Sequence, residues 1–204
     1  MTENFKINPI PYQYNRVTID LIFKNTNKAI EFYKKVFNAK ELNKFEIDNK
    51  VVHAEIMIGD TRIMLADENL KNDIKSAETI GNSGIGLVIF VENVDEVVKL
   101  AIKEGSKLVC NNENDTKYFA EYKADCITNT KYGLREGHII DPFGYRWNIS
   151  SVREAITEEI LKQRYGNIYK NYENKNQSGG ENEMFKEKYY KYKLKYAQFK
   201  NKKK

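Results

Sequence analysis

The apolar positions of this chain follow two periods that alternate along its length. Residues 16–23 alternate between apolar and polar side chains, which predicts a β-strand. Residues 25–40 carry apolar side chains at helical spacing, which predicts an amphipathic helix. Three more strands are predicted at 40–48, 51–58 and 61–67, and the last two are joined as a hairpin by a two-residue loop. The first unit is therefore a strand, a helix and three strands.

A second unit with a similar order follows a polar stretch at 68–83. Its predicted elements are a strand at 84–91, a helix capped by Asn93, a strand at 106–110 and a final hairpin made of "EGHIID" and "YRWNISS". The segment between 110 and this hairpin is predicted to be a long loop. Residues 24–35 align with residues 92–103 at an offset of 68. The shared order of elements indicates an internal repeat.

Composition places both units in an ordinary globular domain with an appendage. The 204 residues are 41% hydrophobic and 31% charged. No apolar run approaches the roughly 20 residues that span a bilayer, and the N-terminus does not have the pattern of a signal peptide. The only two cysteines, Cys110 and Cys126, have no metal-like spacing. Two free thiols in a cytoplasmic protein are therefore expected.

The net charge of +5 is concentrated at the C-terminus. Residues 183–204 hold nine lysines and two acids, a balance of +7, so the rest of the chain carries 5 − 7 = −2. Residues 166–183 are predicted to be a linker and 184–204 a basic helix with an aromatic stripe. Such a tail suits an anionic surface on an acidic protein, a nucleic acid or a membrane. The alternative is that its aromatic residues dock on the domain.

Four segments, in this order, carry a family resemblance: "AIEFYKKVFNAKEL", "HAEIMIGDTRIML", "VIFVENVDEVV" and "IIDPFGYRWNIS". They resemble the vicinal oxygen chelate superfamily of glyoxalases, bleomycin-resistance proteins and extradiol dioxygenases, and its PhnB-like branch most of all. The resemblance covers about 14–165, with modules at about 14–68 and 84–152. It implies an α+β fold in which paired βαβββ modules form an incomplete barrel around a cavity. The C-terminal helical tail resembles Lys/Tyr-rich extensions of giant DNA virus proteins, which implies host cytoplasm or the virion as its location.

The resemblance also implies where a metal would be bound in the metal-dependent members. The four ligand positions fall at Thr18, Met64, Gly86 and Asn148. None of these is a carboxylate, histidine or thiolate, so neither a metal nor another cofactor is expected. His53, Glu55 and His138 are an alternative three-ligand set, but we favour a role for His53 and Glu55 in lining the cavity or in hydrogen bonds between strands.

Strand alternation predicts a polar cavity if the implied positions point inward. A cavity that holds several arginines would suit an anionic ligand, because guanidinium groups bind such anions through paired hydrogen bonds. The alternative is that Arg16, Asp20, Glu55 and Arg62 neutralise one another as ion pairs. Tyr132 and Arg135 lie in a segment that resembles a family loop before the final hairpin, and we add them to the ligand-binding candidates. The complete set is Arg16, Thr18, Asp20, His53, Glu55, Arg62, Tyr132, Arg135, Arg146 and Asn148.

Three functions fit these observations. The sequence contains no local nucleophile motif, phosphate loop or dinucleotide fingerprint, and no catalytic residue can be named. We therefore favour a metal-free protein that binds a small, anionic molecule. A homodimer is one partner arrangement that the resemblance implies, since family members often build cavities by pairing modules within or between chains. A lyase or isomerase with a non-standard site is the first alternative. The second is a virion-associated protein with a catalytically inactive domain.

Overall fold

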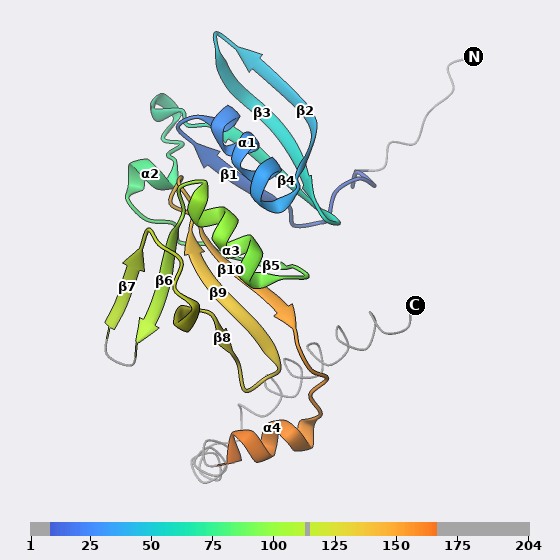
Figure 1. Ribbon diagram of the computed structural model, residues 1–204. Coiled ribbons are helices and arrows are strands. Elements are labelled where there is room, and N and C mark those ends of the chain that lie inside the picture. Colours follow the sequence, from blue (N-terminus) through green and yellow to red (C-terminus); the bar gives the residue numbers. More distant parts are fainter. Residues whose placement is uncertain (1–8, 113–114, 167–204) are drawn as a thin grey trace, which may run out of the picture.

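Two βαβββ modules make up the computed structural model, which describes residues 9–112 and 115–166 (Figure 1). No helix in this part of the chain is long and apolar enough to cross a membrane. The first module consists of β1 Ile19–Phe23, α1 Thr26–Phe37, β2 Lys40–Ile47, β3 Lys50–Ile58 and β4 Thr61–Asp67. Its sheet has the order β1-β4-β3-β2, with β1 parallel to β4.

The second module repeats this order with an insertion. It consists of β5 Gly86–Phe90, α3 Val94–Lys103, β6 Lys107–Asn112, β7 Asp115–Phe119, β8 Thr128–Asn129, β9 Leu134–Ile140 and β10 Arg146–Val152. Its sheet has the order β5-β10-β9-β6-β7, with β8 paired to β9, and β5 is parallel to β10. The predicted α+β class with two βαβββ modules is confirmed, and the two sheets form no closed barrel.

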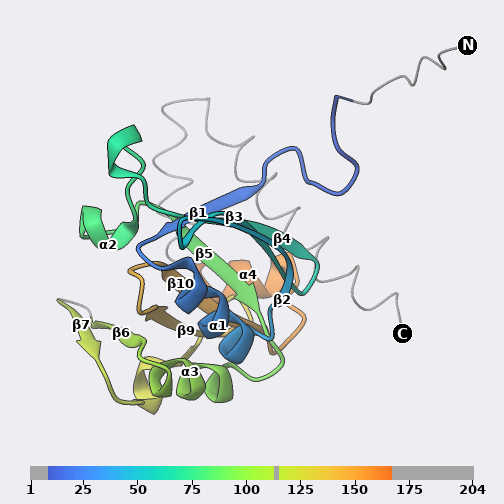
Figure 2. The same cartoon turned by 90° about the horizontal axis from the view of Figure 1, so that it is seen from above.

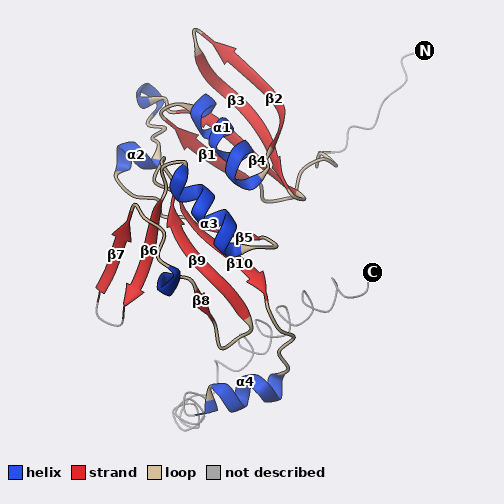
Figure 3. Ribbon diagram, in the orientation of Figure 1, coloured by secondary structure: helices blue, strands red, loops and turns tan. Residues whose placement is uncertain are grey.

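Short helical segments connect and follow the modules (Figure 3). The 3-10 turn η1 Leu70–Asn72 and the helix α2 Ala77–Ile80 occupy the connection between modules, and the 3-10 turn η2 Ala124–Cys126 precedes β8. Helix α4 Glu158–Arg164 follows β10. The linker and the tail predicted for 166–204 lie outside the described residues, apart from residue 166.

Each long helix begins where a polar side chain caps its first turn. The side chain of Asn25 accepts a hydrogen bond from the backbone N of Lys28 at 3.0 Å, and that of Asn93 accepts one from Glu96 N at 3.2 Å. The predicted cap at Asn93 is confirmed. Helices α1 and α3 contact each other and cover their sheets from the same side (Figures 1 and 2).

The hydrophobic core lies between the helices and the sheets and joins the modules. From α1, Tyr33 and Phe37 pack against Trp147 of β10, with ring centroids 5.6 Å and 4.6 Å away. The buried carboxylate of Asp141 accepts hydrogen bonds from Tyr33 Oη at 2.7 Å and Trp147 Nε1 at 3.0 Å. The Tyr145 hydroxyl accepts from the backbone N of Ile22 at 2.9 Å and donates to its O at 2.8 Å. Contacts across the junction therefore hold the two modules as one body.

Alternate side chains on each sheet point away from the helices, onto a surface that we call the open face. On the first sheet this face carries Asp20, Glu55, Arg62 and Met64, and on the second it carries Val88, Glu136, His138, Arg146 and Asn148. No helix of the described residues covers either open face in the way that α1 and α3 cover the opposite faces. The candidate ligand-binding residues are therefore divided between two surfaces.

Two expectations for the segment after β6 are wrong. The predicted long loop contains β7, which extends the sheet beyond β6 and exposes Thr116, Lys117 and Tyr118. The chain then returns through η2, which brings Cys126 to a Cα–Cα distance of 4.9 Å from Cys110, and the two cysteines form a disulfide. The structure thus has no pair of free thiols at these positions.

Candidate functional site

The strand registers align the two open faces residue by residue. Asp20 is opposite Met64 in the first sheet, and Val88 is opposite Asn148 in the second. Because the offset of 68 residues relates Asp20 to Val88, Met64 and Asn148 are counterparts, and so are Arg62 and Arg146, two residues earlier on the same strands. Glu55 is opposite Met64, and His138 is opposite Asn148. The internal repeat thus places an arginine at the equivalent position of both modules. At the position of Glu55, however, the second module has a histidine, His138.

In the first module, these positions form a closed polar cluster. We call it the Glu55 cluster: Tyr14, Asn43, His53, Glu55 and Arg62. Glu55 is only 1% exposed, and its carboxylate accepts hydrogen bonds from Tyr14 Oη, from Arg62 Nη1 and, at 2.8 Å, from Asn43 Nδ2. His53 Nε2 lies 3.3 Å from the same carboxylate, and the Arg62 guanidinium lies 5.1 Å from the centroid of the Tyr14 ring.

The electrostatics of the Glu55 cluster are balanced internally. Burial raises the pKa of Glu55, but the hydrogen bonds from its neighbours outweigh burial and leave the pKa below its ordinary value. Glu55 therefore carries a negative charge that neutralises Arg62. For these two residues the structure has the ion-pair arrangement given above as the alternative.

In the second module, the equivalent arginine lacks such a partner. Arg146 is exposed and makes no hydrogen bond or ion pair with any described residue. Its diagonal neighbour on β9 is His138, where the first module has Glu55. Burial lowers the pKa of His138, and the positive charge of Arg146 lowers it further, against the opposing effect of Glu136. At neutral pH His138 is therefore uncharged and leaves the charge of Arg146 uncompensated.

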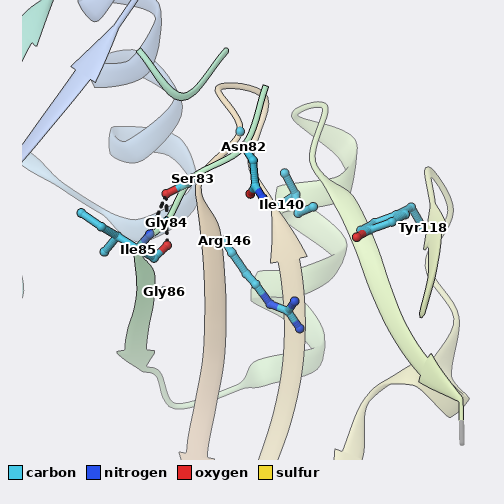
Figure 4. A pocket seen from close by; sticks show the side chains of 9 residues that line it. Asn82, Ser83, Gly84, Ile85, Gly86, Tyr118, Ile140 and Arg146 are labelled. Carbon is cyan, nitrogen blue, oxygen red and sulfur yellow. Dashed lines mark hydrogen bonds between the residues drawn. The ribbon is translucent and has the colours of Figure 1, made fainter. Parts of the chain in front are cut away.

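Arg146 lines a pocket with a volume of about 290 Å³. Figure 4 shows its side chain between the loop that carries Asn82 and Ser83 and the strand that carries Tyr118. The loop is held by Ser83, whose Oγ donates to the Ile85 carbonyl at 3.1 Å and accepts from Ile85 N at 3.2 Å. We call this site the Arg146 pocket; its lining residues are Asn82, Ser83, Gly84, Ile85, Gly86, Tyr118, Ile140, Gly144 and Arg146.

A buried carboxylate that the sequence reading missed lies further along the same open face. Glu136 is 7% exposed and accepts hydrogen bonds from Tyr132 Oη at 2.5 Å, Ser150 Oγ at 3.3 Å and Asn148 Nδ2 at 3.5 Å. The pKa of Tyr132 is well above its ordinary value, first because the residue is buried and second because its hydroxyl donates to Glu136. The i, i+2 spacing of Glu136 and His138 on one strand was the signal that could have identified it.

The remaining candidates are dispersed. Arg135 lies on the helix side of β9, where its Nε is 2.5 Å and its Nη2 2.6 Å from the carboxylate oxygens of Asp95 on α3. Arg16 and Asp20 are exposed, and Thr18 Oγ1 donates to the carbonyl of Asn15 at 3.0 Å. Arg135 and Arg16 therefore do not join Arg146 in one cavity.

The residues at the four implied metal positions do not suit a divalent ion. Thr18, Met64 and Asn148 offer only neutral donors, and Gly86 offers no side chain. The alternative set is divided, because His53 and Glu55 lie on the first sheet and His138 on the second. Among residues 9–112 and 115–166, no three His, Cys, Asp or Glu side chains are grouped so that they could hold a metal ion. We therefore derive no chemistry through a metal.

Comparison with known families agrees with this architecture. Residues 14–109 match the family model of the Glyoxalase/Bleomycin resistance protein/Dioxygenase superfamily. This segment belongs to that superfamily. The match includes the whole first module and extends into β6 of the second. A search of curated proteins found no match.

Solved structures with the same fold are similar to this chain at low sequence identity. A gene product from Arabidopsis thaliana is 19% identical, with a TM-score of 0.51, and the alignment covers 67% of this chain and 98% of that one. The PhnB protein from Bacillus cereus is 15% identical, with a TM-score of 0.50, covering 68% of this chain and 100% of that one. A Pseudomonas aeruginosa protein is 17% identical, with a TM-score of 0.50, covering 69% and 99%. At these identities the likeness concerns the fold alone.

Proposed function

We propose that this superfamily protein binds a small anionic molecule in the Arg146 pocket, without a metal. The observation that carries the proposal is the contrast between two equivalent arginines. Arg62 is neutralised by Glu55, whereas Arg146 lines a pocket and has no acidic partner. A guanidinium beside a pocket with polar walls attracts an anion, because hydrogen bonds to a charged group are about twice as strong as neutral ones.

The surroundings of Arg146 support binding more than catalysis. The pocket offers hydrogen-bonding groups from Asn82, Ser83 and Tyr118 together with apolar contacts from Ile85 and Ile140. Its lining residues include no carboxylate, histidine or thiol that would act as base or nucleophile. The proposed homodimer and the proposed binding of the tail to an anionic surface stay predictions.

The proposal is tested by removing the charge of Arg146. Binding of benzoate, acetate, sulfate and phosphate to the full chain is measured by isothermal titration calorimetry. We expect at least one anion to bind, and Arg146→Gln to weaken it at least tenfold, which corresponds to about 1.4 kcal/mol. Arg153→Gln is the control, because Arg153 is also exposed on the second module but lies outside the Arg146 pocket.

Two results would contradict the proposed function. One is that none of the four anions binds to the wild-type chain. The other is that Arg146→Gln and Arg153→Gln bind the anion equally well, which would place the site elsewhere. Circular dichroism on both variants shows whether the fold is retained.

A further inference from the structure

The Arg146 pocket is the counterpart of the Glu55 cluster in the repeat. The registers already relate Arg146 to Arg62 and His138 to Glu55. The same offset of 68 residues that relates the first strands also relates Asn82 to Tyr14, and both residues precede a first strand and lie near the equivalent arginine. One structural position is thus present twice, with different occupants.

In the first module, the protein fills this position with its own side chains. Glu55 supplies a carboxylate to Arg62, and Tyr14 supplies a phenol ring that lies 5.1 Å from the guanidinium. The ring and the carboxylate also contact each other through the Tyr14 hydroxyl. The first module therefore shows an aromatic ring and a carboxylate bound together beside an arginine.

In the second module, both occupants are missing. Asn82 stands in place of the tyrosine and His138 in place of the glutamate, and neither makes a hydrogen bond or ion pair with Arg146. The space beside Arg146 is a pocket of about 290 Å³. A Cβ atom placed on Gly86, at its edge, would meet nothing within 4 Å, so the wall is also open there.

We infer that the Arg146 pocket takes an aromatic carboxylate from outside, which replaces the carboxylate and the ring that the first module supplies itself. This inference rests on the proposed function and names the class of its ligand. Arg146 is the only cation among the lining residues, so a singly charged anion balances the pocket. Tyr118 and Ile140 provide faces against which a ring can pack.

The first experiment compares four compounds on the full chain by calorimetry: benzoate, its neutral analogue benzamide, the non-aromatic cyclohexanecarboxylate and inorganic phosphate. We expect benzoate to bind tightest of the four. Benzamide should bind at least tenfold more weakly because it lacks the charge. Cyclohexanecarboxylate should bind severalfold more weakly because it lacks the flat ring that packs beside a guanidinium.

The second experiment fills the pocket from within. His138→Glu restores the carboxylate of the first module, and Asn82→Tyr restores its ring. If the new side chains take the place of the ligand beside Arg146, each variant should weaken benzoate binding at least tenfold. His138→Gln adds no carboxylate and should bind benzoate within threefold of wild type. Thr128→Glu is the charge-matched control at an exposed position on β8 and should do the same.

The outcomes separate this inference from the proposed function. If phosphate binds through Arg146 and benzoate does not, the anion site stands and the aromatic carboxylate is wrong. If no compound binds, both fail. If benzoate binds but Asn82→Tyr and His138→Glu bind it as well as Thr128→Glu does, the correspondence with the Glu55 cluster is wrong. Asn82 lies in an exposed loop, so Asn82→Tyr tests the inference even if His138→Glu does not fold.

Discussion

Asp141 is a buried carboxylate that accepts four hydrogen bonds. Its carboxylate is 3% exposed and accepts from Tyr33, Trp147 and the backbone N atoms of Phe143 and Tyr145, at 2.7 to 3.0 Å. Burial raises its pKa, and these four hydrogen bonds act in the opposite direction. The residue therefore holds the turn before β10 and, through Tyr33, joins that turn to α1.

We expect Asp141→Asn to lower the free energy of unfolding by about 3 kcal/mol, because an amide group turns donors toward donors in a buried site. Urea unfolding at pH 7 measures the change. Asp73→Asn is the control: the Asp73 side chain is 83% exposed, and a surface change of this kind stays within about 0.5 kcal/mol. Equal stability of Asp141→Asn and wild type would show that the turn does not depend on the charge.

The strand face on which a candidate residue lies was predictable from the sequence, but the residues with which it pairs were not. The alternation of side chains along a strand correctly indicated that Arg62 shares a face of the sheet with Met64, and that Arg146 shares one with Asn148. It could not show that Arg62 would be neutralised by Glu55 or that Arg135 would turn to Asp95. Those pairs depend on strand register and on the position of α3, which are set by packing between elements distant in sequence.

At the scale of elements, the pair of Asp95 and Arg135 ties α3 to β9. Hydrogen bonds from Arg135, followed by one from Tyr122, hold the pKa of Asp95 at about 2, against the opposing effect of burial. An Asp in an unfolded chain has a pKa of about 3.9. The folded state thus binds a proton less readily than the unfolded state. The stability from this pair is complete above about pH 5 and is lost as the pH falls toward 2.

Asp95→Asn should therefore cost about 1 kcal/mol at pH 7, the upper range for a partly exposed ion pair, and progressively less below pH 4. Urea unfolding of wild type and variant at several pH values measures this difference. Glu92→Gln, at an exposed position just before α3, should follow the wild-type curve. A difference that stays constant down to pH 2 would contradict the assigned role of the carboxylate.

Elements with strong periodicity were predicted closely, and β7 was not predicted at all. The bounds of β4 agree with the predicted strand, and α1 and α3 lie within the predicted helices. β7 is an edge strand in which Thr116, Lys117 and Tyr118 are all exposed, so it has no buried face to produce an apolar period. The missed strand carries Tyr118, which explains why the Arg146 pocket was not foreseen in this form.

On the scale of the whole molecule, the disulfide between Cys110 and Cys126 closes the inserted segment against β6. It spans 16 residues, and cross-links of that size restrict the unfolded chain by about 3 kcal/mol. We expect a reducing agent to lower the free energy of unfolding by about this amount in urea titrations. A variant with Cys110→Ser and Cys126→Ser should be insensitive to the reducing agent. An unchanged wild-type transition after verified reduction would show that the cross-link adds no stability.

The contact between Tyr145 and Ile22 has a consequence for the outer edge of β1. A strand at the edge of a sheet exposes backbone groups that can pair with a strand from another molecule, which is a common route to aggregation. At Ile22 both of these groups are already engaged by one phenol hydroxyl. A foreign strand that approached β1 would have to displace the side chain and break both hydrogen bonds. The junction between the two modules thereby also protects the chain from adding strands to its own sheet.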